Sequence, residues 1–220
     1  MARRPGLDAA AITTAAARVA DREGLDAVSM RAVGRELGVE AMSLYHHLAG
    51  KSALLDTLAD WAFARIVVPD AGRPWRSEMT ERAVSARQVL TAHPWALGLL
   101  ESRRTPGPAL LRHHDAVIGC LRAAGFPVAL AAHAFSVLDA YVYGFVLTEL
   151  NLPFEPGGEG AQELAAELAP ALAEAYPHLA EMMGELVLGR EYSYGDEFEP
   201  GLELVLDGLE VRWRAVVRSG

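Results

Sequence analysis

The sequence predicts an all-α fold, with a helix-turn-helix near the N-terminus followed by a larger helical region. Apolar residues recur at helical spacing along most of the 220 residues, and no segment shows the alternation that is typical of a strand. Glycine and proline lie between the periodic segments, where helices must end. We therefore expect three parts, over residues 1–50, 51–73 and 74–220.

The segment 29–55 is predicted to form two short helices joined by a tight turn, with a third helix after them. Gly38 lies where the first of these helices must end and reverse, because glycine tolerates the positive φ of such a turn. Val39 is expected to return an apolar side chain to the core. The second helix, residues 40–47, carries small side chains with hydrogen-bond donors, so it suits a recognition helix that enters a DNA major groove.

Capping residues, glycine and proline bound the other predicted helices. Asp8 is the expected N-cap of the first helix, and Gly24 its end. Residues 153–160 and 192–200 are expected to be loops, because they are rich in turn-forming residues. The predicted helices cover residues 8–23, 51–68, 75–92, 94–100, 107–124, 128–152, 161–176 (interrupted near Pro170), 177–188 and 201–217.

Several short motifs follow one another along the first 55 residues. They are Arg22-Glu23-Gly24-Leu25, Ser29-Met30-Arg31, Leu37-Gly38-Val39, Leu44-Tyr45 and Lys51-Ser52-Ala53-Leu54-Leu55. In this order and spacing they resemble the N-terminal domain of the TetR family of bacterial transcriptional regulators, over residues 1–65. The resemblance implies a helix-turn-helix DNA-binding domain over 1–50, a connecting helix and linker over 51–73, and a ligand-binding and dimerisation domain over 74–220. We expect a repressor that binds a palindromic operator as a homodimer and is released by a small-molecule effector.

The resemblance also implies which residues contact DNA. Ser29 and Arg31 begin the second helix, where a hydroxyl and a guanidinium can hold a phosphate or a guanine edge. Tyr45 and His47 resemble the family's phosphate-binding pair, and Lys51 adds a cation beside the free amides of the next helix. The tip of the recognition helix, where bases would be read, consists of Ala41, Met42 and Ser43. Because this tip is small and apolar, it favours contact with thymine methyl groups over bidentate hydrogen bonds.

The net charge of −9 is unevenly distributed. Residues 1–55 hold seven basic and six acidic side chains, whereas the rest of the chain holds 13 basic and 23 acidic ones. This asymmetry indicates that DNA meets the N-terminal end. Arg3 and Arg4 have two open roles, a minor-groove arm or solubilising terminal charges. Arg35 is expected on a solvated helix face, with direct phosphate contact as the alternative.

Composition favours a cytoplasmic protein without a membrane partner. Hydrophobic residues make up 51% of the chain, but no uninterrupted apolar run reaches the roughly 18 residues of a membrane span. The N-terminal segment lacks the apolar core of a signal peptide. The single cysteine, Cys120, excludes an intramolecular disulfide and is expected to pack as a small buried hydrophobe.

Two predicted helices, over residues 128–152 and 201–217, carry more apolar surface than one small domain needs to bury. A helix that is apolar on all sides is buried on all sides, which indicates a partner subunit. The resemblance implies that these two helices pair with their copies in a second subunit as a four-helix bundle. The alternative is an interior helix of a monomer.

The second half of the chain also resembles the tetracycline-repressor type, most visibly at Gly125-Phe126 and Tyr143-Gly144-Phe145-Val146-Leu147. Where that type has a histidine and a glutamate that hold a drug-bound magnesium ion, this chain has Glu101 and Thr148. We therefore expect an amphipathic aromatic or polycyclic effector, with no metal and no cofactor. The candidate effector contacts, each with core packing as the alternative, are Trp95, Leu99, Arg104, His114, Val117, Phe135, Asp139, Val142 and Phe145.

The histidines do not indicate an enzyme or a metal centre. His113-His114-Asp115 is the densest cluster, but adjacent helical residues point about 100° apart. The alternative is a zinc site formed by His93, His114 or His133 with Glu101. The sequence has no nucleophile motif or phosphate-binding loop, so we expect no catalytic residues. The competing function is a small-molecule-binding or helical interaction protein without operator binding.

Overall fold

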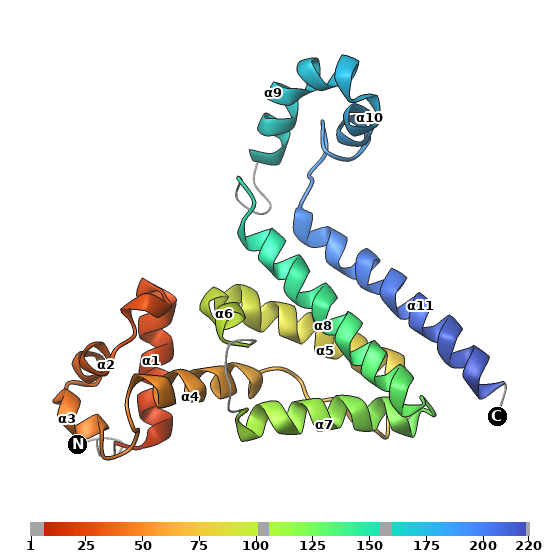
Figure 1. The fold of residues 1–220 in the computed structure, drawn as a ribbon. Helices are drawn as coiled ribbons and strands as arrows, with labels where there is room; N and C mark the ends of the chain where they lie inside the picture. The colour runs from red at the N-terminus through yellow and green to blue at the C-terminus, as the bar shows by residue number, and fades with distance from the viewer. Residues whose placement is uncertain (1–6, 101–105, 155–159, 219–220) are drawn as a thin grey trace. The chain divides into compact units, whose positions relative to one another are not determined.

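The computed structural model describes residues 7–100, 106–154 and 160–218, and every regular element in these ranges is a helix (Figure 1). The predicted all-α fold is therefore confirmed. The chain divides into two compact units: unit 1 comprises residues 1–143 and 213–220, and unit 2 comprises residues 144–212.

Four short elements form the N-terminal part of unit 1: α1 (Ala9–Glu23), η1 (Leu25–Ala27), α2 (Met30–Leu37) and α3 (Ala41–Leu44). Asp8 caps α1 as predicted, because its Oδ1 accepts a hydrogen bond from the backbone N–H of Ala11 at 2.7 Å. Gly24 ends α1, also as predicted. The buried face of α1 includes Ile12, Ala16, Val19 and Ala20.

The recognition helix is shorter than the predicted 40–47, because only Ala41–Leu44 is α-helical. Tyr45 and His47 lie in the turn that follows, where the N–H of His47 bonds to the C=O of Leu44 at 3.0 Å. Such i→i+3 bonds tighten the end of a helix. Leu48 is buried after this turn and holds it against the core.

The next helix, α4 (Lys51–Phe63), also ends earlier than predicted, at Phe63 rather than at residue 68. Ile66 lies in a turn in which its N–H bonds to the C=O of Phe63 at 3.1 Å, and its side chain is buried. Pro69 then disfavours a helical conformation in the residue before it.

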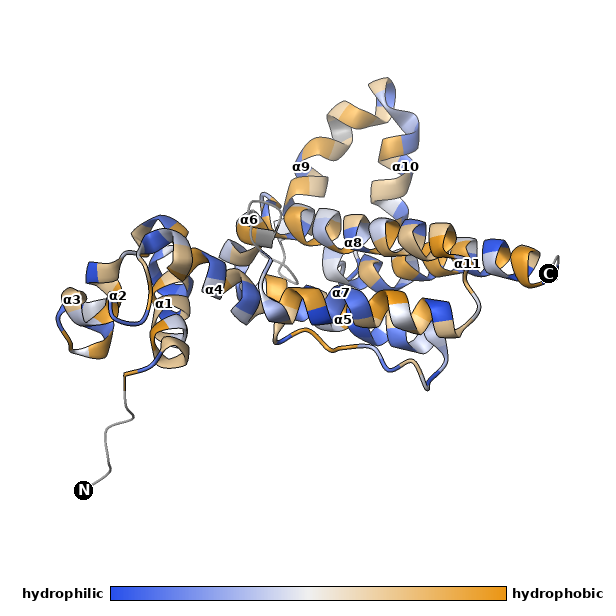
Figure 2. Cartoon of the chain, turned by 60° about the horizontal axis from the view of Figure 1, so that its bottom comes forward, coloured by the Kyte–Doolittle hydropathy of each residue, from blue (hydrophilic) through white to orange (hydrophobic). Residues whose placement is uncertain are grey.

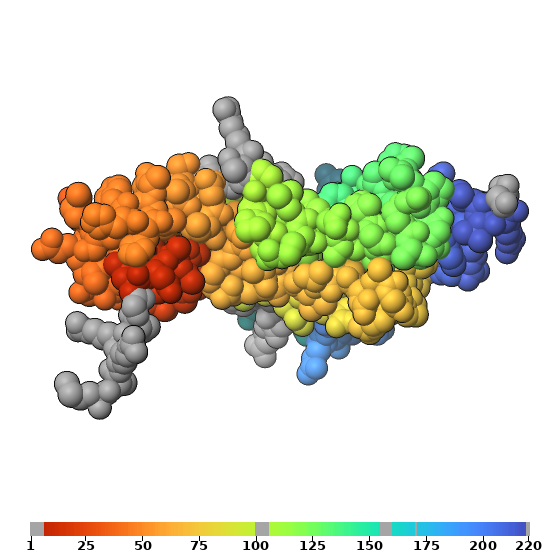
Figure 3. All heavy atoms as spheres, turned by 90° about the horizontal axis from the view of Figure 1, so that it is seen from below, coloured from red at the N-terminus to blue at the C-terminus, as the bar shows by residue number. Residues whose placement is uncertain are grey.

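The rest of unit 1 contains α5 (Trp75–Ala92), η2 (Pro94–Ala96), α6 (Leu97–Leu100), α7 (Pro108–Ala123) and the first part of α8 (Val128–Leu150). The bounds of α5 are those predicted. On the face shown in Figure 3, α7 (green) lies alongside the gold residues at the start of α5.

Unit 2 contains the end of α8, α9 (Gly160–Ala175), α10 (Pro177–Leu186), η3 (Tyr194–Glu197) and most of α11 (Phe198–Val217). The predicted interruption near Pro170 is wrong, because α9 continues through this residue. One proline removes a single backbone donor, and the hydrogen bonds of its neighbours can carry the helix on. The predicted loop 192–200 is too long, because Pro200 lies in the first turn of α11, where a missing N–H leaves no helical hydrogen bond unmade.

An aromatic cluster holds the end of α11 within unit 1. The ring of Trp75 on α5 meets that of Phe126 at 5.0 Å between centroids, and Trp213 stacks on Phe126 at 6.0 Å. The indole N–H of Trp213 donates to the C=O of Ala124 at 2.8 Å. This hydrogen bond joins α11 to the turn that follows α7.

Hydrophobic residues cover much of α8 and α11 (Figure 2). Large apolar side chains stay exposed on both helices: Val128, Val137, Leu147 and Leu150 on α8, and Leu204, Val211, Val216 and Val217 on α11. Among the described residues, α8 is the one helix that is long and apolar enough to cross a membrane. The core helix of a soluble protein can have the same length and composition.

Candidate nucleic-acid interface and ligand-binding core

The turn between α2 and α3 is closed by backbone and side-chain hydrogen bonds. Ser29 caps α2, because its Oγ accepts from the backbone of the first turn at 3.1 Å. Gly38 ends α2 in the left-handed region, with a φ of 68°, as its predicted role requires. The N–H of Val39 bonds to the C=O of Gly34 at 2.9 Å. The predicted return of Val39 to the core is wrong: its side chain is 36% exposed, and the buried Leu44 fills the core here instead.

Several predicted DNA contacts are exposed around this turn. Met42 is 70% exposed and Tyr45 is 50% exposed, although both are large. Exposed large side chains of this kind mark interaction surfaces when they gather in one place. His47 follows α3, and Lys51 begins α4, and both are exposed. The remaining predicted contacts beside them are the exposed Arg31 and the half-buried Ser29, Ala41 and Ser43.

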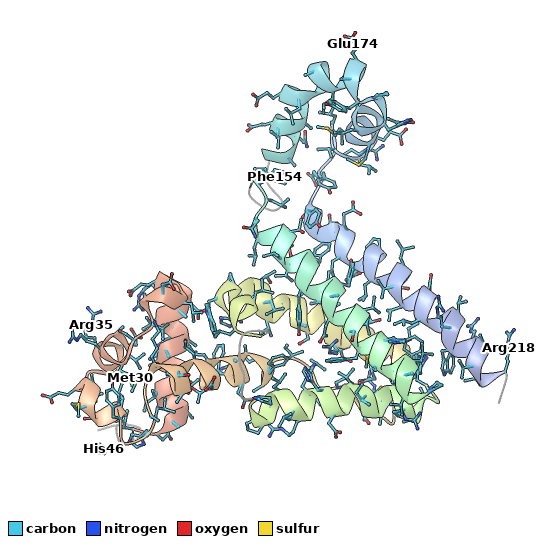
Figure 4. All side chains as sticks on the ribbon, viewed as in Figure 1. Met30, Arg35, His46, Phe154, Glu174 and Arg218 are labelled. Atoms are coloured by element: carbon cyan, nitrogen blue, oxygen red, sulfur yellow. The ribbon has the colours of Figure 1, made fainter. Side chains whose placement is uncertain are left out.

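Cations on this surface are available to a phosphate. Within the described ranges, no acidic side chain pairs with Arg31, Arg35 or Lys51. In Figure 4, Arg35 projects outward from α2, and His46 from the turn after α3. By contrast, Arg18 and Arg22 on α1 both pair with Glu36, at 2.8 and 3.2 Å. The available positive charge therefore lies on α2 and α4 rather than on α1.

A buried polar cluster joins α5, α7 and α8 in unit 1. Arg82 on α5 is 1% exposed, and its Nε donates to Nε2 of His113 on α7 at 2.8 Å. The guanidinium of Arg82 also forms an ion pair with Asp139 on α8. Burial, with a smaller contribution from the charge of Arg82, lowers the pKa of His113 to about 3. The imidazole of His113 is therefore neutral at pH 7.

Aromatic rings surround this polar cluster. Phe63 on α4 lies 5.8 Å from His113 and 5.7 Å from His114, measured between ring centroids. His114 meets Phe135 on α8 edge to face at 4.7 Å, and burial lowers the pKa of His114. A few polar groups within apolar and aromatic walls are typical of a small-molecule site.

The predicted effector contacts are distributed over several places. His114, Phe135 and Asp139 border the polar cluster. Trp95, Leu99, Val117 and Val142 are buried, and packing in the core also explains their burial. Phe145 and Thr148 belong to unit 2, where Phe145 packs on Tyr194 and Phe198. Arg104 and Glu101 lie outside the described residues.

The sequence interpretation missed Arg82 and His113. A signal for Arg82 was present, because it lies three residues after Met79 and four before Ala86, on the buried face of α5. A charged residue on such a face is unusual unless it is paired. No sequence signal separates His113 from its neighbour His114, because either ring could face the core.

Two carboxylates of the N-terminal helices accept hydrogen bonds from the rest of unit 1. Asp60 on α4 accepts hydrogen bonds from the first backbone N–H groups of α7, at 2.7 Å from Ala109 and 3.0 Å from Leu110. Asp21 on α1 accepts from the indole N–H of Trp95 at 2.6 Å. A displacement of α7 or η2 would therefore act directly on α4 and α1.

Metal ligands do not gather in the described part of the chain: no three His, Cys, Asp or Glu side chains there form a metal-binding group. His133, one of the zinc candidates, is exposed on α8. Cys120 is buried as expected, and burial raises the pKa of its thiol.

Two family models match most of the chain. Residues 12–58 match "Bacterial regulatory proteins, tetR family", and residues 68–213 match "Tetracyclin repressor-like, C-terminal domain". The chain is 32% identical over 219 residues to the HTH-type transcriptional repressor DrrR1 of Streptomyces coeruleorubidus, across 94% of this chain and 79% of that protein. It is 31% identical over 211 residues to tetracycline repressor protein class A from transposon 1721 of Escherichia coli, across 94% and 92%.

Solved structures give the same picture. Apo ActR from Streptomyces coelicolor superimposes with a TM-score of 0.79 at 27% identity, across 97% of this chain and 100% of ActR. ActR in complex with actinorhodin superimposes with a TM-score of 0.76 at 28% identity, across 92% and 95%.

Proposed function

Because the chain belongs to the TetR family of bacterial regulatory proteins, we propose that it represses transcription from a palindromic operator. It binds this operator as a homodimer in the bacterial cytoplasm and leaves it when a small-molecule effector binds. The observation that carries the proposal is the exposed surface of α2, α3 and α4. On that surface, Arg31, Arg35 and Lys51 have no acidic partner in the described ranges. These cations lie on either side of α3, which exposes the apolar side chain of Met42.

On DNA, α3 enters the major groove with Met42 at the base edges, while the residues around it hold phosphates. Tyr45, His47 and Lys51 supply donors on the C-terminal side of the tip. The hydroxyl of Ser29 accepts in its helix cap and still has its proton to donate to a phosphate. Two symmetric copies read half-sites one helical turn apart, roughly 34–36 Å.

The dimer interface uses the exposed apolar residues of α8 and α11. On α11, Leu204 is 76% exposed and Val211 is 69% exposed, and their spacing of seven residues places them on one face. On α8, Leu147 is 57% exposed. Fully burying a side chain of this size contributes roughly 1.5–3 kcal/mol. A second copy of the chain is the partner that supplies the matching surface.

The effector binds among α5, α7 and α8 of unit 1, and the signal passes from α7 to α4 through Asp60. α4 begins just after the turn that carries Tyr45 and His47. A displacement of α4 therefore changes the distance between the two recognition helices of the dimer. The effector must prefer the state that cannot bind DNA, by about 1.4 kcal/mol for each tenfold loss of operator affinity.

The effector is an amphipathic aromatic or polycyclic compound that needs no divalent cation. The rings of Phe63, His114 and Phe135 favour an aromatic ligand, and ActR has been solved with actinorhodin. Thr148 is exposed, and its hydroxyl donates to the C=O of Gly144 at 3.0 Å, so it offers no carboxylate to a magnesium ion.

A gel shift on the DNA upstream of the chain's own gene tests the operator proposal. We expect a discrete complex whose affinity falls steeply with salt, by about 10³–10⁵ between 50 and 200 mM for six to ten phosphate contacts. A scrambled DNA of the same length is the control and should bind with lower affinity. Equal binding to both, or none to either, would favour a helical ligand-binding protein without an operator.

A further inference from the structure

Two buried nitrogen atoms of the polar cluster, Nη1 of Arg82 and Nδ1 of His113, have no hydrogen-bond partner among the residues that the structure describes. The first side chain is 1% exposed and the second 0%. Each residue satisfies its other nitrogen atoms within unit 1, because Nε of Arg82 meets Nε2 of His113 and Nη2 meets Asp139. Buried polar atoms without a partner are rare in folded proteins and cost free energy.

Both of these atoms are hydrogen-bond donors. The Nε of an arginine only donates, so Nε2 of His113 must accept, at 2.8 Å. The ring is neutral, because its pKa is lowered to about 3, and the single ring proton therefore lies on Nδ1. Nη1 of Arg82 likewise can only donate hydrogen bonds. Within the described residues, this part of the core therefore lacks a hydrogen-bond acceptor for these two donors.

The charge of the cluster decides which kind of acceptor fits. The guanidinium of Arg82 is already neutralised by Asp139 through their ion pair. A ligand carboxylate would add a second negative charge with no cation of its own, and an uncompensated buried charge is costly. An uncharged carbonyl oxygen satisfies the donors without this cost.

We propose that the effector is an aromatic ketone or quinone whose carbonyl oxygens accept hydrogen bonds from Arg82 and His113. Its ring system packs against Phe63, His114 and Phe135, which border the same cluster. The proposal rests on the proposed function only in taking this core as the effector site.

Three compounds with one ring skeleton test the proposal. Fluorenone carries the carbonyl, fluorene has a methylene in its place, and fluorene-9-carboxylate carries an anion. We expect equilibrium dialysis to show that fluorenone binds about ten- to a hundredfold more tightly than fluorene, the range for a hydrogen bond to a charged group. The carboxylate should bind more weakly than fluorenone. Absent fluorenone binding, equal affinity for fluorenone and fluorene, or tighter binding of the carboxylate would overturn the proposal.

Two variants assign the preference to Arg82. Arg82→Lys keeps a cation for Asp139 but removes Nη1, so the preference for fluorenone over fluorene should fall towards one. Phe135→Leu removes an aromatic wall and keeps both donors, so both affinities should fall and their ratio should persist. A preference that survives in Arg82→Lys, with helix content and melting temperature near those of the unchanged protein, would also contradict the proposal.

The gel shift separates this inference from the proposed function. DNA binding by the unchanged protein tests the regulator, and the fluorenone preference tests the site. If the protein binds upstream DNA but shows no fluorenone preference, only the inference fails. If it prefers fluorenone but binds no operator, only the proposed function fails.

Discussion

Asp60 on α4 and Ala109 on α7 are joined by a hydrogen bond of 2.7 Å, in which the backbone N–H of Ala109 donates to Oδ1 of Asp60. The N–H of Leu110 donates to the same oxygen at 3.0 Å. A carboxylate here satisfies free amides and lies at the positive end of the helix dipole. Gly107 permits this approach, because a Cβ at that position would overlap the side chain of Asp60. The helix that carries His113 is thus held at its start by α4.

Replacing Asp60 by Ala should therefore loosen the start of α7. We expect the free energy of unfolding to fall by about 1–2 kcal/mol, the usual cost of a lost helix cap. Urea unfolding measures this loss, and faster amide exchange at Ala109 and Leu110 would locate it. Asp115→Ala, an exposed acidic residue on the same helix, is the matched control and should change little. Equal unfolding midpoints for the two variants would contradict the capping role.

The phosphate-binding residues should act on all DNA sequences alike. We expect Tyr45→Phe and Lys51→Ala each to weaken DNA binding by about 1–2 kcal/mol, roughly five- to thirtyfold. Lys51→Ala should also reduce the slope of log affinity against log salt by about one. Met42→Gln should instead change which base sequence is preferred. Arg18→Ala is the control, because Arg18 is paired with Glu36. Unchanged operator affinity in both Tyr45→Phe and Lys51→Ala would show that phosphate binding is assigned to the wrong residues.

The parts of the fold that the sequence predicted well have local causes. Asp8 caps its own helix, and Gly24 and Gly38 end helices through their own backbone conformations. The start of α1 and the ends of α1 and α2 could therefore be predicted from neighbouring residues. The errors have tertiary causes: just after α4, the backbone N–H of Val67 donates to the hydroxyl of Ser85 on α5 at 3.0 Å instead of to a helical carbonyl.

The polar cluster could not be predicted from the sequence. Arg82 and His113 are 31 residues apart and meet only because α5 packs against α7. The sequence indicated that residues 201–217 carry excess apolar surface, but it did not reveal that Leu209 is 7% exposed while Leu204 is 76% exposed. Deciding which apolar positions face the chain's own core requires the packed structure.

This difference determines how the dimer is tested. Leu209→Arg would disturb the chain's own core, whereas Leu204→Arg and Val211→Arg place the charge on exposed positions of one face. We expect either of these two variants to convert the dimer to a monomer in light scattering, because a buried arginine without a partner opposes association. Glu174→Arg, which projects from α9 in Figure 4, is the control and should leave the dimer intact. A dimer mass for both α11 variants would exclude this face as the interface.

The lowered pKa of His113 makes the stability of the protein depend on pH. The pKa is about 3 in the folded protein, against an ordinary value of 6.5 in the unfolded chain. Between these values the unfolded chain binds a proton that the folded chain does not. The neighbouring charge of Arg82 and the ring of His114 both oppose protonation of His113. Stability is therefore full above about pH 6.5 and is lost as the pH falls towards 3.

A change from pH 7 to pH 5 should thus lower the free energy of unfolding by about 2 kcal/mol through His113 alone. His113→Gln removes the titrating group and keeps an oxygen that can accept from Arg82, so its stability should vary less over this range. Urea unfolding at the two pH values measures the difference. His178→Gln is the matched control, because His178 is 98% exposed on α10 and its variant should retain the full dependence. An equally steep loss in His113→Gln would mean that the buried imidazole is not the group that takes up the proton.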